Sequence, residues 1–458
     1  MKRLKILLLT MLSSSVFAQD KPNILFIFAD DWGWGDLSCH GHPYVKTPNI
    51  DRLAAEGTDF HRFTVASGVC SPSRAAVMTG HFPARYSIDG HFAWASSNAK
   101  RNMPDWLSLT APLLPRMLQK AGYATAHFGK WHLSNNMISD SPLPSQYGYD
   151  TYGAFNCAGE QMPVHEDARN AIAFIEETNK AEKPFFINLW IHEPHTPFHT
   201  VPKYRWRFPN LNEADNIYAS VLSHADDRVG EVLDTLERLN ISDNTLVIFS
   251  SDNGPARGVG NVPLTLKHDT ATGAGYGLGG AKGITGGRKG YKGSLFEGGI
   301  GVPFLARWPK HIAAGKVDES SLISAVDLLP TFCEIAGAEL PVGYEPDGLS
   351  QVSVLMGKAS VKREKPLFWK MDNQWPGSKD KPDHWVGYAV VDQNWKLVTD
   401  RNLKYFELYD IVADPYEKND LKANHAEVLA SLTKKLTDWT ATLPAGPDKD
   451  TFSAERTK

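Results

Sequence analysis

Two pairs of adjacent oxygen-bearing side chains each end a continuous apolar run, and together they could bind a metal ion. The pairs are Asp30 with Asp31 and Asp252 with Asn253. Carboxylate and amide oxygens are ligands for hard divalent cations, and the sequence shows no cysteine and histidine spacing typical of zinc. Any one of these acids could equally cap a helix or stay on the surface. Their pairing after two apolar runs favours a metal site.

Cys70 is predicted to lie in the first turn of a helix. Pro72 suits that turn, and residues 75–78 can continue the helix. The exposed N–H groups and the dipole at a helix N-terminus favour negative charge. Arg74 lies one turn further on and faces the same way. On Cys70 alone, a buried structural cysteine is the simpler interpretation, so its neighbours must decide.

Three apolar runs predict the strands that would hold these residues in place. The runs cover residues 23–29, 184–191 and 245–251, and the second is followed by His192. Continuous apolar runs of this length are typical of parallel strands that are buried on both faces. Helical patterns lie between them, at 47–57, 111–122, 165–179 and 215–239. The alternation predicts an α/β fold with a large, mostly parallel sheet sandwiched by helices. Ligands of such sheets bind beyond the carboxyl ends of the strands, where all three runs carry polar residues.

Two further regions depart from this alternation. Residues from Gly254 to Gly290 are rich in glycine and lack apolar periodicity, which predicts a long flexible loop. After about residue 360, short alternating runs and a helical pattern at 424–443 predict a short antiparallel sheet with a helix. We therefore expect a catalytic α/β domain at 19–360 and a smaller C-terminal subdomain at 361–458.

The string from Cys70 to Arg74, followed by Thr79 and Gly80, resembles the signature of the type I sulfatases. Maturation enzymes of that family oxidise the cysteine to formylglycine (3-oxoalanine). Further strings match the family in order, at residues 23–31, 47–53, 129–132, 251–254, 292–299 and 407–417. The resemblance is closest to bacterial polysaccharide sulfatases and N-acetylgalactosamine-6-sulfatase-like enzymes. It implies an alkaline-phosphatase-like sulfatase fold.

The resemblance also implies a metal centre and a nucleophile. A Ca²⁺ ion would be bound by Asp30, Asp31, Asp252, Asn253 and the modified Cys70. One hydroxyl of the hydrated aldehyde at Cys70 would attack sulfur, and Asp252 would accept its proton. The second hydroxyl matters because a serine sulfate would have no internal route to release its product.

Positive side chains are needed around the sulfuryl oxygens, since the charge of a sulfate ester repels nucleophiles. By the resemblance, Arg74 and Lys130 would hold the diol, and Lys130 and Lys292 would bind the sulfate oxygens. Arg288 and Lys289 compete for the role of Lys292, but Lys292 has the spacing of the family string.

The resemblance assigns two histidines to proton transfer. His192 would protonate the departing alcohol oxygen, and His132 would deprotonate the second hydroxyl so that sulfate leaves. His195 competes with His192, but the position of His192 directly after the strand leaves His195 for substrate contact. One departure from the family is Gly301, where many relatives carry arginine.

Composition and the first residues indicate which partners to expect. The net charge of −4 offers no basic excess for nucleic acid. Residues 1–18 are typical of a cleaved secretory signal, and their apolar run is shorter than the roughly 20 residues that span a bilayer. We therefore expect an exported protein, periplasmic or secreted, with no stable membrane association. A sulfatase-maturing enzyme would act on Cys70, which leaves the other cysteines, Cys39, Cys157 and Cys333, able to form at most one disulfide.

The expected substrate is a sulfated carbohydrate. Strings around residues 30–36 and 191–198 resemble bacterial sulfatases of amino-sugar and galactan sulfates, which implies exo attack on oligosaccharides of a sulfated galactan or glycosaminoglycan. Trp94, with Asp89 and His91 nearby, is a candidate for sugar contact. Two alternatives stay open: a formylglycine-dependent phosphonate or phosphate monoester hydrolase on the same fold, and a catalytically dead carbohydrate-binding relative.

Overall fold

The computed structural model describes residues 21–258, 265–269, 271–277, 282–358, 362–372 and 386–457. The predicted signal peptide at 1–18 and the predicted domain boundary at 360 lie outside these ranges. Among the described residues, no helix combines the length and the apolar character needed to cross a bilayer.

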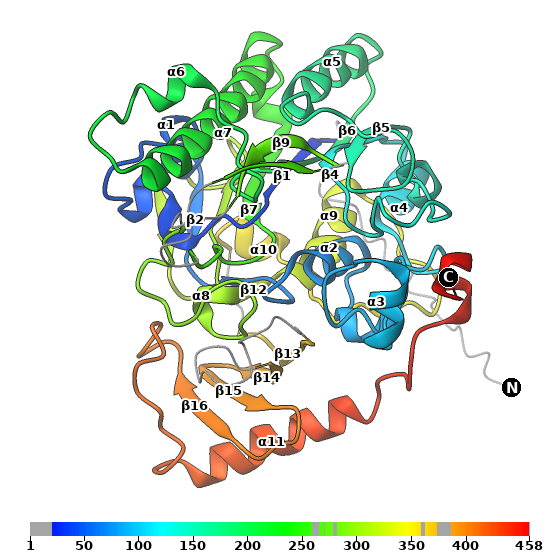
Figure 1. Cartoon of the computed structure of the whole chain (residues 1–458), viewed down its shortest axis with the longest axis vertical. Coiled ribbons are helices and arrows are strands. Elements are labelled where there is room, and N and C mark those ends of the chain that lie inside the picture. The colour runs from blue at the N-terminus through cyan, green and yellow to red at the C-terminus, as the bar shows by residue number, and fades with distance from the viewer. Residues whose placement is uncertain are drawn as a thin grey trace, which may run out of the picture.

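A sheet of eight strands forms the centre of the molecule (Figure 1). Its strand order is β11-β2-β10-β7-β1-β6-β4-β5. Only β10 runs antiparallel to its neighbours within this sheet, so the prediction of a large, mostly parallel sheet is confirmed. The strands are β1 Asn23–Ala29, β2 Thr58–Phe60, β4 Ala124–Lys130, β5 Thr151–Phe155, β6 Phe185–Trp190, β7 Thr245–Ser251, β10 Phe304–Arg307 and β11 Lys316–Asp318.

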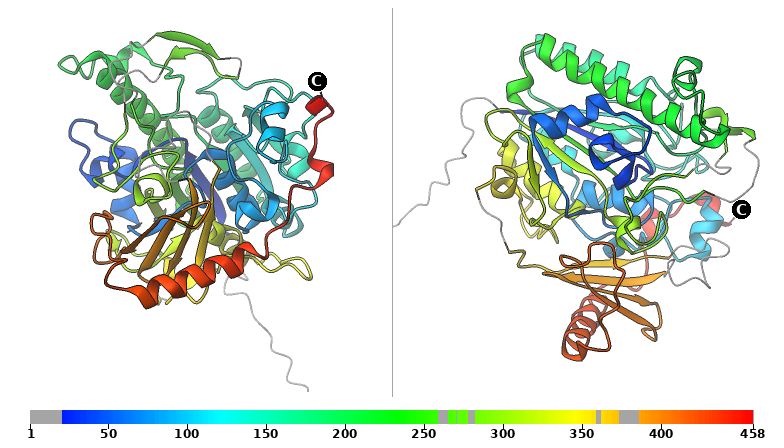
Figure 2. Two further views of the ribbon diagram at one scale, coloured as in Figure 1. Left: turned by 60° about the horizontal axis from the view of Figure 1, so that its bottom comes forward. Right: turned by 90° about the vertical axis from the view of Figure 1, so that its left-hand side faces the viewer.

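Helices cover both faces of this sheet, because alternate residues of a strand point to opposite sides. In β1, Phe26 and Phe28 belong to one buried apolar cluster, and Leu25 and Ile27 belong to the other. The first cluster includes helices α2, α4 and α9, and the second includes α1, α5 and α7, of which α7 runs along one side of the molecule (Figure 2). These helices are α1 Pro48–Glu56, α2 Cys70–Thr79, α4 Leu114–Lys120, α5 Asp167–Lys180, α7 Glu213–Arg238 and α9 Leu328–Ala336.

Four antiparallel strands and a helix form the C-terminal unit, as predicted (Figure 1). Lys396 on the third of these strands is fully buried and lies 2.8 Å from Glu297 and 2.9 Å from Glu417. Trp369 also donates a hydrogen bond of 2.8 Å from its indole nitrogen to the carbonyl of Val65. These buried polar contacts fix the unit on the catalytic part. The elements are β13 Leu367–Lys370, β14 Gly387–Asp392, β15 Trp395–Asp400, β16 Phe406–Asp410 and α11 Ala426–Thr440.

The prediction of an unstructured loop from Gly254 to Gly290 is wrong in its centre. Strands β8 Leu266–Asp269 and β9 Gly273–Tyr276 form an antiparallel pair there. The backbones of Tyr276 and Phe198 also exchange two hydrogen bonds, of 2.7 and 2.9 Å, which ties β9 to the segment after β6. Glycines hide such a strand in the sequence, because they carry no side chain that could reveal its alternation. Residues 259–264, 270 and 278–281 of this region lie outside the described ranges.

Shorter elements complete the catalytic part. They are the helices α3 Ala95–Lys100, α6 Pro202–Arg205, α8 Glu297–Ile300 and α10 Val352–Leu355, and the paired strands β3 Phe63–Thr64 and β12 Ile323–Ser324.

Candidate active site

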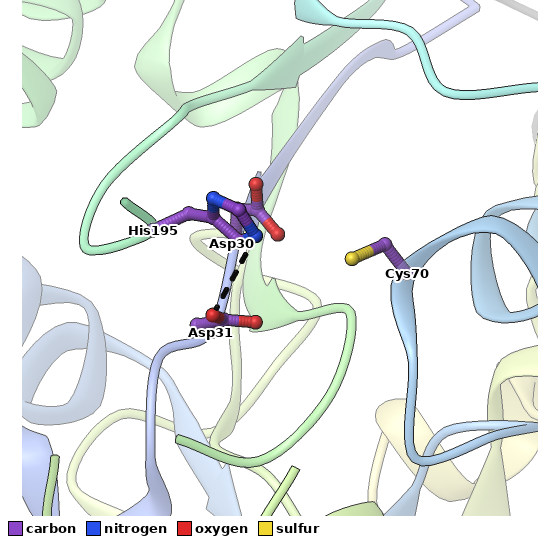
Figure 3. A group of neighbouring side chains, drawn as sticks. All are labelled: Asp30, Asp31, Cys70 and His195. Atoms are coloured by element: carbon purple, nitrogen blue, oxygen red, sulfur yellow. Dashed lines mark ion pairs between the residues drawn. The ribbon is translucent and has the colours of Figure 1, made fainter. Parts of the chain in front are cut away.

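The carboxyl ends of four central strands meet at one edge of the sheet and carry the predicted polar residues. Asp30 follows β1, Lys130 ends β4, His192 follows β6, and Asp252 follows β7. Opposite them, Cys70 is the first residue of α2, and Figure 3 shows its sulfur pointing toward the two aspartates after β1. The topology of the sheet thus brings together residues that are far apart in the sequence.

The paired oxygen ligands converge as a metal site would require. Asn253 donates a hydrogen bond of 2.7 Å to Asp31, and the backbone N–H of Asp31 donates one of 3.3 Å to Asp252. Asp31 has a φ of +67°, which is unusual for a residue other than glycine. This left-handed turn ends the alternation of β1, so adjacent carboxylates can serve one site.

Two oxygen atoms of this group lack a hydrogen-bond partner among the described residues. They are Oδ1 of Asp30 and Oδ1 of Asn253, and both are buried. Buried polar atoms are normally paired, so these two oxygens fit a hard cation. One ligand atom each from Asp30, Asp31, Cys70 and His195 also lies within 4.8 Å of the others.

Two buried cations, Arg74 and Lys130, balance the carboxylates. Arg74 donates hydrogen bonds of 3.0 and 2.6 Å to one oxygen of Asp252, and Lys130 forms an ion pair with Asp30. Burial alone would raise the pKa of Asp30, but the positive charges around it hold that pKa well below its usual range. Burial and the neighbouring Asp30 raise the pKa of Asp252 to about 7. Arg74 also stacks over Trp190, 5.0 Å from the ring centre, which fixes its guanidinium group.

Lys292 reaches this centre from the glycine-rich region. Its ammonium group lies 2.6 Å from Asp31. The competing cations lie elsewhere: Lys289 pairs with Glu407 at 2.6 Å, and Arg288 donates a hydrogen bond of 3.0 Å to the carbonyl of His61. Of the three, Lys292 is the one that lines the cavity described next.

A cavity of about 370 Å³ opens above Cys70. Its lining contains the two lysines, the three histidines and one metal-site aspartate predicted from the sequence, together with Trp94, which is 57% exposed. The predicted site residues in the lining are Asp31, Cys70, Lys130, His132, His192, His195 and Lys292. The remaining four, Asp30, Arg74, Asp252 and Asn253, lie beneath it in the contacts described above.

Four histidines of the described chain line the cavity; His132 and His192 are buried, and the side chain of His195 is 25% exposed. Desolvation lowers the pKa values of these three. The pKa of His192 falls to about 4, and those of His132 and His195 fall well below the usual range. His132 and His192 each use Nε2 to donate to a backbone carbonyl, of Phe92 at 3.0 Å and of Pro197 at 3.1 Å. Because a carbonyl can only accept, Nδ1 of each neutral ring carries the lone pair. Neither Nδ1 atom has a hydrogen-bond partner among the described residues.

Burial also affects the protonation of the Cys70 thiol. It raises the pKa of Cys70 to about 12, although Lys130 and Lys292 oppose the rise. The Nζ atom of Lys130 lies 3.6 Å from the sulfur. An unmodified Cys70 would therefore stay protonated at neutral pH and would be a weak nucleophile.

Some predictions of sugar contact need correction, and other lining residues were missed. His91 and Trp94 line the cavity, but Asp89 does not: it lies 2.7 Å from Lys370 of the C-terminal unit and lines a different hollow. Asn135 and Thr272 were not predicted. Asn135 belongs to an irregular segment, and Thr272 lies in the β8–β9 turn. Neither position has a periodicity or a motif that could have marked it.

The position of Arg288 explains why residue 301 is a glycine. A Cβ atom at position 301 would lie 2.4 Å from Nη1 of Arg288. Arg288 itself lies 3.7 Å from Glu297. A guanidinium group from a different position in the chain thus occupies the space beside Gly301.

The four cysteines are free, so none of them forms a disulfide. Cys39 is exposed, and Cys157 and Cys333 are buried.

Comparison with known proteins points to one family. A family model described as Sulfatase matches residues 22–338, and one described as N-sulphoglucosamine sulphohydrolase, C-terminal, matches residues 289–442. Human N-acetylgalactosamine-6-sulfatase is 30% identical and aligns with 91% of this chain and 84% of its own length. N-acetylgalactosamine-6-O-sulfatase of Bacteroides thetaiotaomicron is 27% identical, covering 91% of this chain and 92% of that protein.

A solved structure agrees in fold as well. The crystal structure of Ps i-CgsB in complex with k-i-k-neocarrahexaose superposes with a TM-score of 0.76 at 27% identity, covering 94% of this chain and 96% of that chain. Since the Sulfatase model spans more than half of the sequence, the chain belongs to the sulfatase family and is a sulfuric ester hydrolase.

Proposed function

We propose that this sulfatase removes sulfate from carbohydrates through a formylglycine made from Cys70, with Ca²⁺ in the site. The observation that carries the proposal is the position of Cys70: it begins α2, lies 3.6 Å from Lys130, and faces the aspartates after β1. The high pKa of its thiol supports a chemical conversion before turnover, because the thiol itself would be a weak nucleophile there. A sulfatase-maturing enzyme would supply that conversion.

The oxygen ligands support calcium. Asp30, Asp31, Asp252 and Asn253 would hold the ion together with the modified Cys70. The buried Oδ1 atoms of Asp30 and Asn253, which accept no hydrogen bond from the described residues, fit this role. When bound, the ion supplies positive charge beside the sulfuryl group, and the hydrated aldehyde supplies two hydroxyls on one carbon. Lys130 and Lys292 would bind the sulfuryl oxygens, which compete for the same ammonium groups that now contact the aspartates.

His192 and His132 would each transfer a proton, in different steps of the reaction. His192 lines the cavity, and its unpaired Nδ1 would have to be protonated to donate to the leaving oxygen. The negative charge of a bound sulfate favours that protonated form. His132 Nδ1 carries a lone pair in the neutral ring, and the low pKa of His132 keeps the ring neutral and able to accept a proton.

The two histidines should therefore fail in different ways. We expect His192→Ala to lose about 10²- to 10⁴-fold in kcat on a sugar sulfate but clearly less on an aryl sulfate, whose phenol leaves without help. His132→Ala should instead accumulate sulfated enzyme, which intact-protein mass spectrometry detects. Equal losses of His192→Ala on both substrates would move the acid role to His195.

The cavity supports a carbohydrate substrate and exo attack. Its volume of about 370 Å³ is in the range of small-ligand pockets, and Thr272 of the β8–β9 turn contributes to its wall. The exposed indole of Trp94 offers a flat apolar face for a sugar ring. N-acetylgalactosamine sulfatases and a carrahexaose complex among the similar proteins support a galactose-type residue of a galactan or a glycosaminoglycan.

Defined substrates test this assignment. The mature enzyme is incubated with intact sulfated polymer and with short oligosaccharides, and each lost sulfate is located by NMR. We expect terminal sulfates to leave first, with rates on oligosaccharides at least about tenfold above those on polymer. Rapid loss of internal sulfates contradicts exo attack, and activity confined to steroid or lipid sulfates contradicts a carbohydrate substrate. An aryl phosphonate tested beside an aryl sulfate separates sulfatase from phosphonate hydrolase activity.

We also propose that the protein acts outside the cytoplasm. The basic and apolar residues at 1–18 support export to the periplasm or the medium, where sulfated polymers and their fragments are found. Sequencing the N-terminus of the protein secreted by its natural host tests whether cleavage occurs near Ala18.

A further inference from the structure

A second group of side chains with metal-ligand chemistry lies next to the candidate active site. It consists of His165, Glu193 and His224, which each offer one ligand atom within 4.8 Å of the others. His165 precedes α5, Glu193 follows His192 after β6, and His224 lies in α7. Three segments that are distant in the sequence therefore meet at this group.

The atoms that meet there make no well-oriented hydrogen bond within the described part of the chain. Nε2 of His165, Oε1 of Glu193 and Nδ1 of His224 are buried, and none has a hydrogen-bond partner among the described residues. Nε2 of His165 and Oε1 of Glu193 lie 2.9 Å apart and form an ion pair when the histidine is protonated. Glu193 is completely buried. Unsatisfied polar atoms in a native interior need an explanation, and here three of them converge.

Two carboxylates and one arginine lie at this group. Oε2 of Glu193 pairs with Arg228, and Arg228 also pairs with Asp167. Asp167 thus offsets the charge of the arginine, while the arginine holds the carboxylate of Glu193 with its second oxygen toward the histidines. In a neutral ring, one nitrogen of His224 keeps a lone pair that a metal ion can use.

We propose that His165, Glu193 and His224 bind a zinc ion. Two imidazoles and one carboxylate form a common zinc ligand set, with a water in the fourth position. Zinc ligands at about 2 Å from the ion lie roughly 3 to 3.5 Å apart, so the set needs only small rotations to close. The side chain of His165 is 24% exposed, which leaves a route for the ion and its water. Calcium prefers oxygen ligands, so the two metal sites select different ions.

The ion would act as a clamp behind the cavity. Glu193 directly follows His192, and His195 lies two residues further on. Fixing Glu193 to α7 and to the segment before α5 would hold the backbone that positions both histidines. None of the three zinc ligands belongs to the proposed calcium site, so zinc binding here requires neither the proposed substrate nor the proposed nucleophile.

Zinc binding to the full mature protein tests the proposal directly. The protein is kept in excess calcium, freed of other metals, and titrated with zinc in a calorimeter, with His224→Gln and His165→Gln as variants. We expect about one zinc per wild-type chain and affinities at least about 100-fold weaker in either variant. Zinc should also raise the melting temperature of the wild type by about 2 to 4 °C, and that of the variants by much less.

Other thiol and imidazole groups need a control. Cys39, His40 and Asp59 form another group with ligand chemistry, so Cys39→Ser serves as the matched variant. Full zinc binding in Cys39→Ser supports the proposal, and its loss there overturns it. A wild type that binds no zinc, or glutamine variants that bind as the wild type does, also overturns it. If a variant unfolds, the visible spectrum of cobalt in the wild type decides: nitrogen and oxygen ligands support the site, and a thiolate band contradicts it.

Discussion

Replacement of Cys70 by alanine is expected to abolish sulfate release and leave the fold intact. Enzymes that lose a covalent nucleophile commonly slow by about 10⁴-fold or more. The hydroxyl residues beside Cys70 in α2, Ser71 and Ser73, are buried, and neither lines the cavity. The side chain of Cys70 is small and buried, so its loss should cost only about 1 kcal/mol of folding free energy. Rates and melting temperatures measured side by side check both statements.

Cys333→Ala is the matched control. Cys333 is also a buried free cysteine, but it lies in α9, 3.7 Å from the sulfur of Met117 and within the apolar core. This variant should keep its activity. An active Cys70→Ala protein would remove Cys70 from the nucleophile role.

The mass of the peptide that contains Cys70 separates catalysis from binding. An aldehyde at this position in protein from the natural host supports turnover through formylglycine. A thiol found there, with sugar binding but no hydrolysis, would instead favour the carbohydrate-binding alternative.

The residues at the strand ends were predictable because the apolar runs identify the strands and the parallel direction of the strands fixes where they end. Continuous apolar runs identify buried parallel strands, and parallel strands must place their carboxyl ends on one edge. That reasoning, which needs only the sequence, places Asp30, His192 and Asp252 together. Lys292 could be predicted only through the family string, since its segment has no periodicity of its own.

Contacts between segments without a pattern could not be predicted. Asp89 follows the catalytic helix closely in sequence, yet Lys370 of the C-terminal unit draws it away from the cavity. The sequence alone also gives no sign of the group of His165, Glu193 and His224. Its members are dispersed over three segments, and only the packing of α5 and α7 on the same face of the sheet makes them neighbours.

Loss of the proposed calcium ion is the second large effect that we expect. Chelation, or the variant Asn253→Ala, should lower bound calcium from about one ion per chain to background and lower kcat by at least about 10³-fold. Asn253 is the better choice for mutation than Asp252. Removing Asp252 would leave the buried Arg74 without its main partner, at a cost of about 3 to 5 kcal/mol, and would confuse unfolding with metal loss.

Asn253→Asp provides the contrast within the same position, because it keeps an oxygen where the unpaired amide oxygen now lies. This variant should retain calcium and part of the activity. Asp89→Asn is the control for a buried aspartate outside the cavity and should keep both. Elemental analysis of each purified protein, beside its rate on an aryl sulfate, gives the comparison. Full activity in a calcium-free Asn253→Ala protein would show that the four oxygen ligands do not hold a calcium ion that catalysis needs. Stoichiometric zinc in place of calcium at these oxygens would likewise contradict the calcium site. The sulfatase assignment would stand in either case, since it rests on the family match and not on the ion.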